Sequence, residues 1–152
     1  MGNRMMVVGL CGVLGLLLLT GCAAFKKGPT DEELVMQQVQ AFTADFLAAN
    51  ADNLLKYISD DFTNDRVASK KEIADHLAKA KEKGRIEEFK TFIADNHGAV
   101  DLKDAKVTIK DGVATVYPIL ASADMGSVTV ELTLKKDPDK VWRAVGINVE
   151  GI

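Results

Sequence analysis

After residue 29 the chain first shows the apolar and polar pattern of an amphipathic α-helix. Thr30 and Glu33 have the spacing of a capping box, in which each side chain satisfies a backbone N–H at the helix start. Apolar side chains then recur at the spacing of one buried helix face, at Val35, Val39, Phe42 and Phe46. The pattern predicts a long first helix that buries this face.

Two further helices are predicted behind the first one. Residues 50–52 break the apolar pattern, and Asp52 is suited to cap a short second helix. Ser69 and Glu72 form a second capping box, which predicts the start of a third helix. A lysine and a glycine at residues 83–84 are typical of a helix end, so the third helix is expected to stop there.

Residues 86–93 are compatible with two kinds of structure. Their apolar residues have helical spacing, but the run is short and rich in aromatic side chains. We favour a strand or an irregular segment here.

The second half of the chain has the pattern of an antiparallel sheet. Four segments are typical of strands: residues 107–110, 113–120, 127–134 and 141–149. Asp111 and Gly112 predict a tight hairpin turn between the first two, and the second is apolar on both faces, as in a central strand. Pro118 lacks an N–H for the ladder and predicts a bulge or a locally unpaired edge. Helices followed by strands predict an α+β fold, with the helices covering one face of a curved sheet.

The N-terminal residues have the pattern of a secretory leader. Arg4 precedes an apolar run over residues 5–19, which is shorter than the roughly 20 residues that span a bilayer. The run ends in Leu-Thr-Gly-Cys at residues 19–22, which resembles a bacterial lipobox. The resemblance implies a leader of residues 1–21 and a diacylglycerol on Cys22, with residues 22–29 as a short tether. An uncleaved anchor, or a secreted protein with a chance cysteine, are the alternatives.

The lipobox also implies a location. The domain would lie outside the cytoplasm, in the periplasm of a cell with two membranes, held to the cell membrane or the outer membrane by its lipid. Ala23 follows the cysteine, and lipoproteins without aspartate there resemble those sorted to the outer membrane. Two or more acyl chains would make this anchoring durable.

Composition narrows the chemistry of the remaining domain. Removing residues 1–21 from the 152 leaves 131, which suits one domain over residues 30–152. The formal net charge of −3 becomes −4 with the loss of Arg4, so no electrostatic case for nucleic acid exists. The two cysteines are Cys11, in the leader, and Cys22, so disulfides, a catalytic thiol and thiolate metal sites are excluded from the domain.

Several segments together resemble the nuclear transport factor 2-like superfamily, which includes SnoaL-like proteins and ketosteroid isomerases. They are "FLAANADNLLKYISDDFTND", "SKKEIADHL", "AKVTIKDGVATVYPI" and "VTVELTLKKDPDKVWRAVGI". The motif residues in this order are Asp61-Phe62, Lys71-Glu72-Ile73 and Trp142-Arg143, and the resemblance covers residues 30–147. It implies a cone, in which a bent sheet wraps around helices and often leaves a pocket in its mouth.

The catalytic residues of the isomerases do not transfer to this chain. Those enzymes place a tyrosine on the inner face of the first helix, where this chain has only apolar side chains. His76 and Asp45 are the weak candidates for a general base. Two histidines, His76 and His97, supply no metal-ligand pattern, and no cofactor is expected.

The aromatic residues are candidates either for a ligand pocket or for the core. The ligand candidates are Phe42, Phe46, Tyr57, Tyr117 and Trp142. We predict a non-enzymatic binding or accessory module at the envelope, whose partner is a small apolar ligand or an envelope protein. A homodimer through the open sheet face is a further expectation from the resemblance. The alternative is a small SnoaL-type or isomerase-type enzyme with an apolar ligand in the cone.

Overall fold

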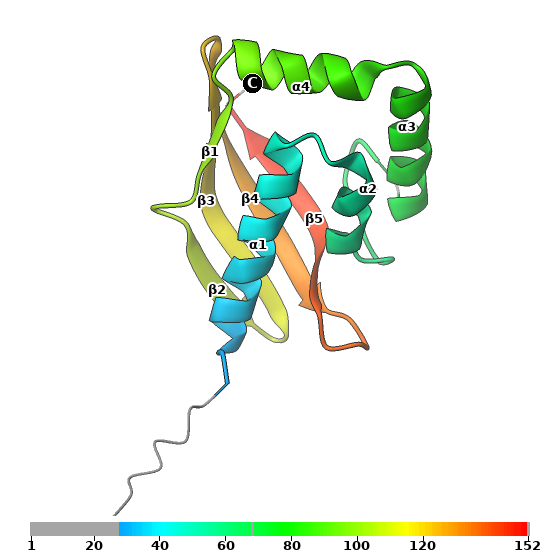
Figure 1. The fold of residues 1–152 in the computed structure, drawn as a ribbon. Coiled ribbons are helices and arrows are strands. Elements are labelled where there is room, and N and C mark those ends of the chain that lie inside the picture. Colours follow the sequence, from blue (N-terminus) through cyan, green and yellow to red (C-terminus); the bar gives the residue numbers. More distant parts are fainter. Residues whose placement is uncertain (1–27, 68, 152) are drawn as a thin grey trace, which may run out of the picture.

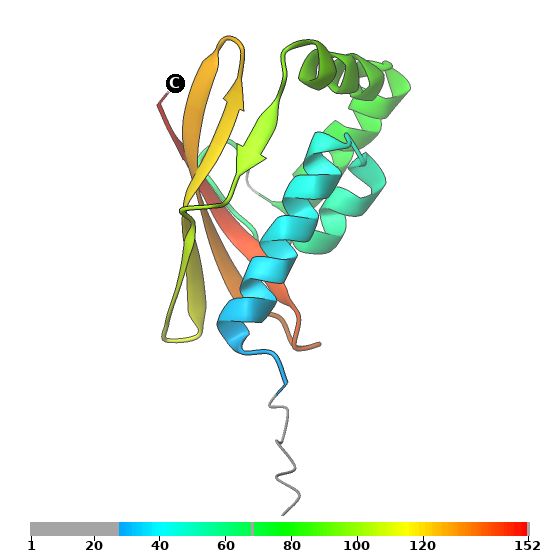
Figure 2. The ribbon, with the colours of Figure 1, turned by 60° about the vertical axis from the view of Figure 1, so that its left-hand side comes forward.

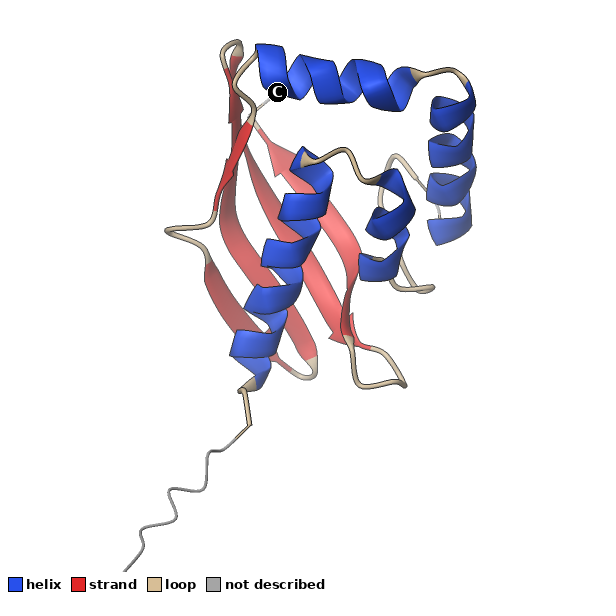
Figure 3. Ribbon diagram, in the orientation of Figure 1, coloured by secondary structure: helices blue, strands red, loops and turns tan. Residues whose placement is uncertain are grey.

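The computed structural model describes residues 28–67 and 69–151. The predicted leader, Cys22 and most of the tether lie outside them. A five-stranded antiparallel sheet curls around the first helix, and the other helices gather beside that helix and across one end of the sheet (Figures 1 and 2). The order of elements is helices first and strands afterwards (Figure 3), so the predicted α+β fold is confirmed.

Helix α1 (Asp31–Leu47) begins at the predicted capping box. The backbone N–H of Glu33 donates to Thr30 Oγ1 at 3.2 Å, and the N–H of Thr30 donates to the Glu33 carboxylate at 2.8 Å. The predicted apolar face is buried, since Val35 is 0 % exposed and Val39 is 1 % exposed. The helix therefore forms where the local sequence predicts it and packs against the concave face of the sheet.

The second helix is continuous with a 3₁₀ turn: α2 (Ala51–Leu54) runs into η1 (Leu55–Tyr57). The prediction that Asp52 caps α2 is wrong, because the helix begins one residue earlier and Asn50 occupies the cap position. Both carboxylate oxygens of Asp52 instead accept from Lys81 Nζ, at 3.0 Å each. An aspartate next to a helix start can cap the helix or pair with a cation. Here Asp52 pairs with Lys81, which lies 29 positions away in the sequence.

Helix α3 (Lys70–Glu82) begins at Ser69, whose hydroxyl oxygen accepts from the N–H of Glu72 at 3.3 Å. Gly84 ends it with a φ of 70°, as predicted. Helix α4 (Arg85–Asp95) follows at once and lies across one end of the sheet (Figure 1). The preference for a strand or irregular segment at residues 86–93 is wrong, because these side chains meet α1 and the sheet end along one helical face.

The sheet is built around its long third strand. The strands are β1 (Ala99–Asp101), β2 (Lys106–Lys110), β3 (Val113–Ala123), β4 (Gly126–Lys136) and β5 (Trp142–Glu150). β1 and β2 both pair with one edge of β3, while β4 pairs with its other edge and β5 pairs with β4. β3 is therefore central, as predicted, whereas β1 is a three-residue strand that no alternation in the sequence indicated.

Turn and bulge residues lie where the sequence predicts them. Asp111 and Gly112 have φ angles of 52° and 76° in the β2–β3 hairpin, the left-handed values that a tight two-residue turn requires. The register between β3 and β4 shifts between Val116 and Ile119, so the ladder is irregular around Pro118, where a bulge or a locally unpaired edge is expected. The long strand can bend there and wrap around α1.

The core lies between α1 and the concave face of the sheet. Its buried members are Val35, Val39, Ala114, Val116, Ile119, Leu132, Leu134 and Trp142. All of them belong to the described residues, so a chain beginning at Gly28 keeps every member of this cluster. Among the described residues, no helix is both long and apolar enough to cross a membrane.

Candidate functional site

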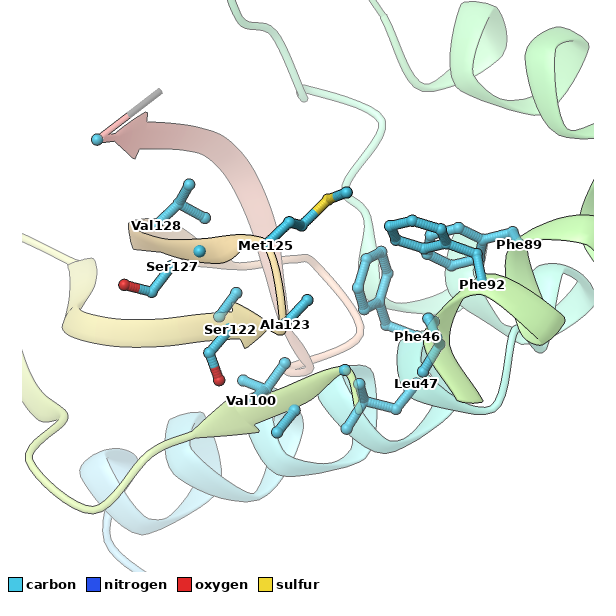
Figure 4. A pocket seen from close by; sticks show the side chains of 16 residues that line it. Phe46, Leu47, Phe89, Phe92, Val100, Ser122, Ala123, Met125, Ser127 and Val128 are labelled. Atoms are coloured by element: carbon cyan, nitrogen blue, oxygen red, sulfur yellow. The ribbon is translucent and has the colours of Figure 1, made fainter. Parts of the chain in front are cut away.

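A hollow of about 450 Å³ opens at the end of the sheet that α4 crosses, and we call it the mouth hollow. Its walls come from the end of α1, from α4, from β1 and from the β3–β4 hairpin (Figure 4). The lining residues are Phe46, Leu47, Phe89, Phe92, Ile93, Gly98, Ala99, Val100, Ala121, Ser122, Ala123, Met125, Gly126, Ser127, Val128 and Gly151. Its volume lies in the range of small-molecule sites.

Aromatic rings form one wall of the mouth hollow. Phe46 on α1 and Phe89 on α4 meet edge to face, with ring centroids 5.4 Å apart. Phe92 lies beside them, and the Met125 side chain extends from the β3–β4 hairpin toward the rings (Figure 4). All four side chains are more than a third exposed, from 36 % for Phe89 to 74 % for Met125. Apolar area left in water in this way is available for burial against a ligand.

A second hollow, of about 250 Å³, continues from the first between α1 and the concave face of the sheet, and we call it the inner hollow. Its lining is Phe42, Thr43, Phe46, Val100, Ile119, Ala121, Val128, Val130, Leu132, Ile147 and Val149. Thr43 is its one polar side chain, and the Thr43 hydroxyl donates to the carbonyl of Gln40 at 3.0 Å. The inner hollow is therefore a hydrocarbon surface.

The linings of the two hollows are almost entirely apolar. Neither lining contains an acidic, basic, tyrosine or histidine side chain. The hydroxyl groups of Ser122 and Ser127 point away from the three phenylalanine rings (Figure 4). A general acid or base must reach the proton it transfers, directly or through one water. The described lining supplies no such group.

Three of the five predicted ligand residues come together, because the Phe42 ring contacts both Phe46 and Tyr57, but only Phe42 and Phe46 line a hollow. Phe42 and Phe46 line the inner hollow, with their rings 6.3 Å apart, and Phe46 also lines the mouth hollow. Tyr57, Tyr117 and Trp142 line neither hollow. Tyr117 is 41 % exposed and donates to Glu150 Oε2 at 3.4 Å, whereas Trp142 belongs to the core and is 3 % exposed.

Phe89, Phe92 and Met125 are among the lining residues of the mouth hollow that the prediction missed. Phe89 and Phe92 lie in residues 86–93, where we noted the helical spacing of the apolar residues but favoured a strand or an irregular segment. Met125 lies in the turn of the β3–β4 hairpin and is largely exposed. No apolar pattern in the residues around it indicated that its side chain would line a pocket. The helical spacing of Phe89 and Ile93 was the one signal available.

Asp45, a candidate base, is held in a polar network at the end of α1. Its carboxylate accepts from the hydroxyl of Tyr57 at 2.6 Å, and from the side-chain amides of Asn50 at 2.9 Å and Asn53 at 3.3 Å. The Tyr57 hydrogen bond, more than the two amides, lowers the pKa of Asp45, and the same bond raises the pKa of Tyr57. A carboxylate stabilised as an anion in this way is a weak base, and the network joins α1 to α2 instead.

The other candidate base, His76, has an exposed side chain on α3 and lines neither hollow. His97 pairs with Asp124 at 2.9 Å, beside the β3–β4 hairpin. Within the described residues, no group of three or more histidine, cysteine, aspartate or glutamate side chains could hold a metal ion. No acidic, basic or histidine side chain belongs to either described lining, although His97 and Asp124 directly neighbour the lining residues Gly98, Ala123 and Met125 in the sequence.

A separate polar cluster lies around Arg143, at the turn between β4 and β5. Arg143 donates to both oxygens of Asp139, at 2.8 and 2.7 Å, and to Asp137 at 3.0 Å. The hydrogen bonds that Arg143 donates to Asp139 are the largest of the causes that hold the pKa of Arg143 above its ordinary value. Ser59, which is 2 % exposed, also donates to Asp137, at 2.7 Å. The hydrogen bonds of Arg143 to Asp137 and Asp139 therefore stabilise the β4–β5 turn.

The Asp45 network predicts a loss of stability in acid. Because the pKa of Asp45 is lower in the folded chain than in the unfolded one, its contribution is present above the unfolded value of about 3.9 and is lost as the pH falls through the folded value. We expect the urea midpoint to fall between pH 7 and pH 3, and to fall less in Asp45→Asn than in the natural chain. Asp104→Asn, on an exposed turn, is the control. Equal falls in Asp45→Asn and the natural chain would contradict the prediction.

Comparisons with known proteins identify the fold. No family model matches the sequence, and no curated protein matches it. A nuclear transport factor 2-like protein with a cystatin-like fold from Novosphingobium aromaticivorans aligns over 78 % of this chain and 80 % of its own, with a TM-score of 0.54 and 15 % identity. A ketosteroid isomerase-like protein from Erwinia carotovora atroseptica aligns over 79 % of this chain and 96 % of its own, with a TM-score of 0.52 and 14 % identity.

A third structure is that of Bd1075 from Bdellovibrio bacteriovorus, with a TM-score of 0.51 and 8 % identity. It aligns with 78 % of this chain, which spans 39 % of the length of Bd1075. Together with the curved five-stranded sheet, these structures establish the nuclear transport factor 2-like cone as the fold of this chain. Identities this low extend to the fold alone, because one fold carries many functions.

Proposed function

We propose that this chain is a membrane-anchored, non-enzymatic module that binds a small apolar ligand in the mouth hollow. The observation that carries the proposal is a hollow of about 450 Å³ with half-exposed phenylalanines and a methionine in its wall and no ionisable side chain in its lining. Covering apolar surface of this kind yields about 25 cal/mol per Å² removed from water. Binding energy is therefore available there, whereas a group that transfers protons is not.

The enzyme hypothesis receives less support from the same site. Asp45 accepts three hydrogen bonds and lines neither hollow, and His76 lies on the exposed face of α3. A ketosteroid isomerase-type reaction requires a base and two proton donors around one apolar ligand. No described residue of either lining could fill one of these three roles.

The proposed anchor is a lipid on Cys22, at the lipobox of residues 19–22. A tether over residues 22–29 spans at most about 25 Å, so the domain would stay close to a cell membrane or outer membrane. α1 begins at the end of the sheet opposite α4 and its 17 residues extend about 25 Å (Figure 1). The mouth hollow would then open away from the anchored end of the domain.

The convex face of the sheet is the surface that we propose for a homodimer. The helices lie on the concave side (Figure 2), and the convex side carries Tyr117 and Leu120, each 41 % exposed. Thr129, Glu131 and Thr133 lie beside them on β4 and are half-buried. An envelope protein is the alternative partner for this face.

Filling the mouth hollow with protein should remove ligand binding. We expect Ala123→Trp, in a chain beginning at Gly28, to weaken binding of the apolar dye 1-N-phenylnaphthylamine at least tenfold, because the indole would occupy the space beside Phe46 and Phe89. The measurement is the rise in dye fluorescence on titration with protein. Leu120→Trp is the matched control, since Leu120 lies on the same strand and outside both linings.

Two results would contradict the binding proposal. One is a natural chain that produces no saturable rise in dye fluorescence. The other is an Ala123→Trp chain that binds the dye as tightly as Leu120→Trp does. Cooperative thermal unfolding of each variant establishes that the comparison concerns the pocket and not the fold.

A further inference from the structure

The mouth hollow and the inner hollow adjoin at one ring of side chains, which we call the waist. Phe46, Val100, Ala121 and Val128 line both hollows. The sheet register explains three of them, because Val100 of β1 and Val128 of β4 are the two lateral partners of Ala121 on β3. The waist is therefore a row across three strands, with the Phe46 ring of α1 as its fourth side.

The waist has its smallest side chain at its centre, because Ala121 carries only a methyl group. Phe46 stacks with Phe42 on one side and meets Phe89 edge to face on the other, so its ring is positioned by neighbours from both hollows. A ligand that extends from the mouth hollow into the inner hollow must contact the four residues of the waist, because they line both hollows.

The lining determines which part of a ligand can enter. An unpaired charge or polar group costs free energy in a lining without charged side chains. The inner hollow offers the already bonded Thr43 hydroxyl as its one polar side chain. The part of the ligand beyond the waist must therefore be hydrocarbon, and any polar head must remain in the mouth hollow, where water has access.

We propose, on the basis of the proposed function, that the ligand is a single flexible hydrocarbon chain whose tail passes the waist and whose head stays at the mouth. A linear chain can bend around Phe46 and fill two hollows of about 450 and 250 Å³ in series. A rigid fused-ring molecule cannot bend and is restricted to the mouth hollow. Chain length and flexibility, rather than charge, decide what binds.

The test is a series of linear primary alcohols of increasing length, from six to fourteen carbons, that displace 1-N-phenylnaphthylamine from the chain beginning at Gly28. Each added methylene should tighten binding about fourfold, until the inner hollow is filled. The rigid comparison is the tetracyclic steroid androstenedione, which should bind more weakly than the longest alcohols. Affinity that is independent of chain length, or a steroid that binds more tightly than every alcohol, would overturn the inference.

Two variants of the waist give opposite expectations. Ala121→Phe narrows it, so the gain in affinity with chain length should stop at a shorter alcohol than in the natural chain, whereas Leu120→Phe, on the opposite face of β3, should leave the series unchanged. Phe46→Ala widens the waist, so the steroid should gain affinity relative to the alcohols. An Ala121→Phe series that matches the Leu120→Phe series would also overturn the inference.

The outcomes separate this inference from the proposed function. If the dye binds but chain length has no effect, a compact apolar ligand is indicated and only the flexible-chain inference fails. If neither the dye nor any alcohol binds the natural chain, the proposed function fails as well.

Discussion

Trp142→Ala is expected to lower the free energy of unfolding by about 3–5 kcal/mol, the usual range for removing a large buried aromatic side chain. Trp142 is 3 % exposed and belongs to the core cluster. Its indole N–H donates to Asp31 Oδ1 at 3.2 Å, and Lys136 Nζ lies 5.3 Å from the ring centroid. Lys136 also pairs with Asp31, so the tryptophan joins the start of α1 to the end of the sheet.

Urea unfolding followed by far-ultraviolet circular dichroism measures this loss without relying on tryptophan fluorescence. Met125→Ala is the control, because Met125 is 74 % exposed and such a change is expected to stay within about 0.5 kcal/mol. Trp142→Phe keeps a packed ring but loses the bond to Asp31, so its loss should be smaller than that of Trp142→Ala. A loss below about 1 kcal/mol for Trp142→Ala would show that the site can collapse around the missing ring.

Cys22→Ser is expected to abolish lipid attachment completely. The thiol of Cys22 is the group that would carry the diacylglycerol if residues 19–22 act as a lipobox. We expect the natural chain to incorporate labelled palmitate in a bacterial host, and its mature N-terminal peptide to have the mass of an acylated cysteine. Two or three acyl chains on one residue would hold the domain durably, because each buried methylene contributes about 0.8 kcal/mol.

Cys11→Ser is the matched control for this experiment, since Cys11 is the other cysteine and precedes the lipobox. It should be labelled as well as the natural chain is. Palmitate labelling that persists in Cys22→Ser, or a natural chain that starts at another residue without a fatty acid, would refute the anchor. Either result would remove the membrane from the proposed function while leaving the binding pocket as an independent question.

Local patterns predicted most helices and strands because their causes are local. The capping box of Thr30 and Glu33 needs only three residues of separation, and the turn at Asp111 and Gly112 needs two adjacent left-handed residues. Pro118 indicated an irregular ladder for the same reason, since a residue without an N–H cannot donate to a neighbouring strand. These features follow from chemistry that lies within a few residues.

The errors share the opposite property. Asp52 was expected to cap a helix, but its partner Lys81 lies 29 positions away. Residues 86–93 were expected as a strand or irregular segment, but they form α4, whose Phe89 ring meets Phe46 of α1 edge to face. Trp142 was a candidate either for the pocket or for the core, and its N–H meets Asp31, which lies 111 positions away. In each case, a contact with a residue far away in the sequence determined which of two locally possible roles the residue adopts.

Most of the helices and strands, the central strand, the absence of cysteine after residue 22 and the resemblance of residues 19–22 to a lipobox can be recognised from the printed residues. The pocket cannot, because its waist joins Phe46 of α1 to Val100, Ala121 and Val128 of three different strands. Only strand register and the packing of α1 bring these four side chains together. Whether an apolar side chain becomes core or pocket wall depends on what packs against it, and that is a property of the folded chain.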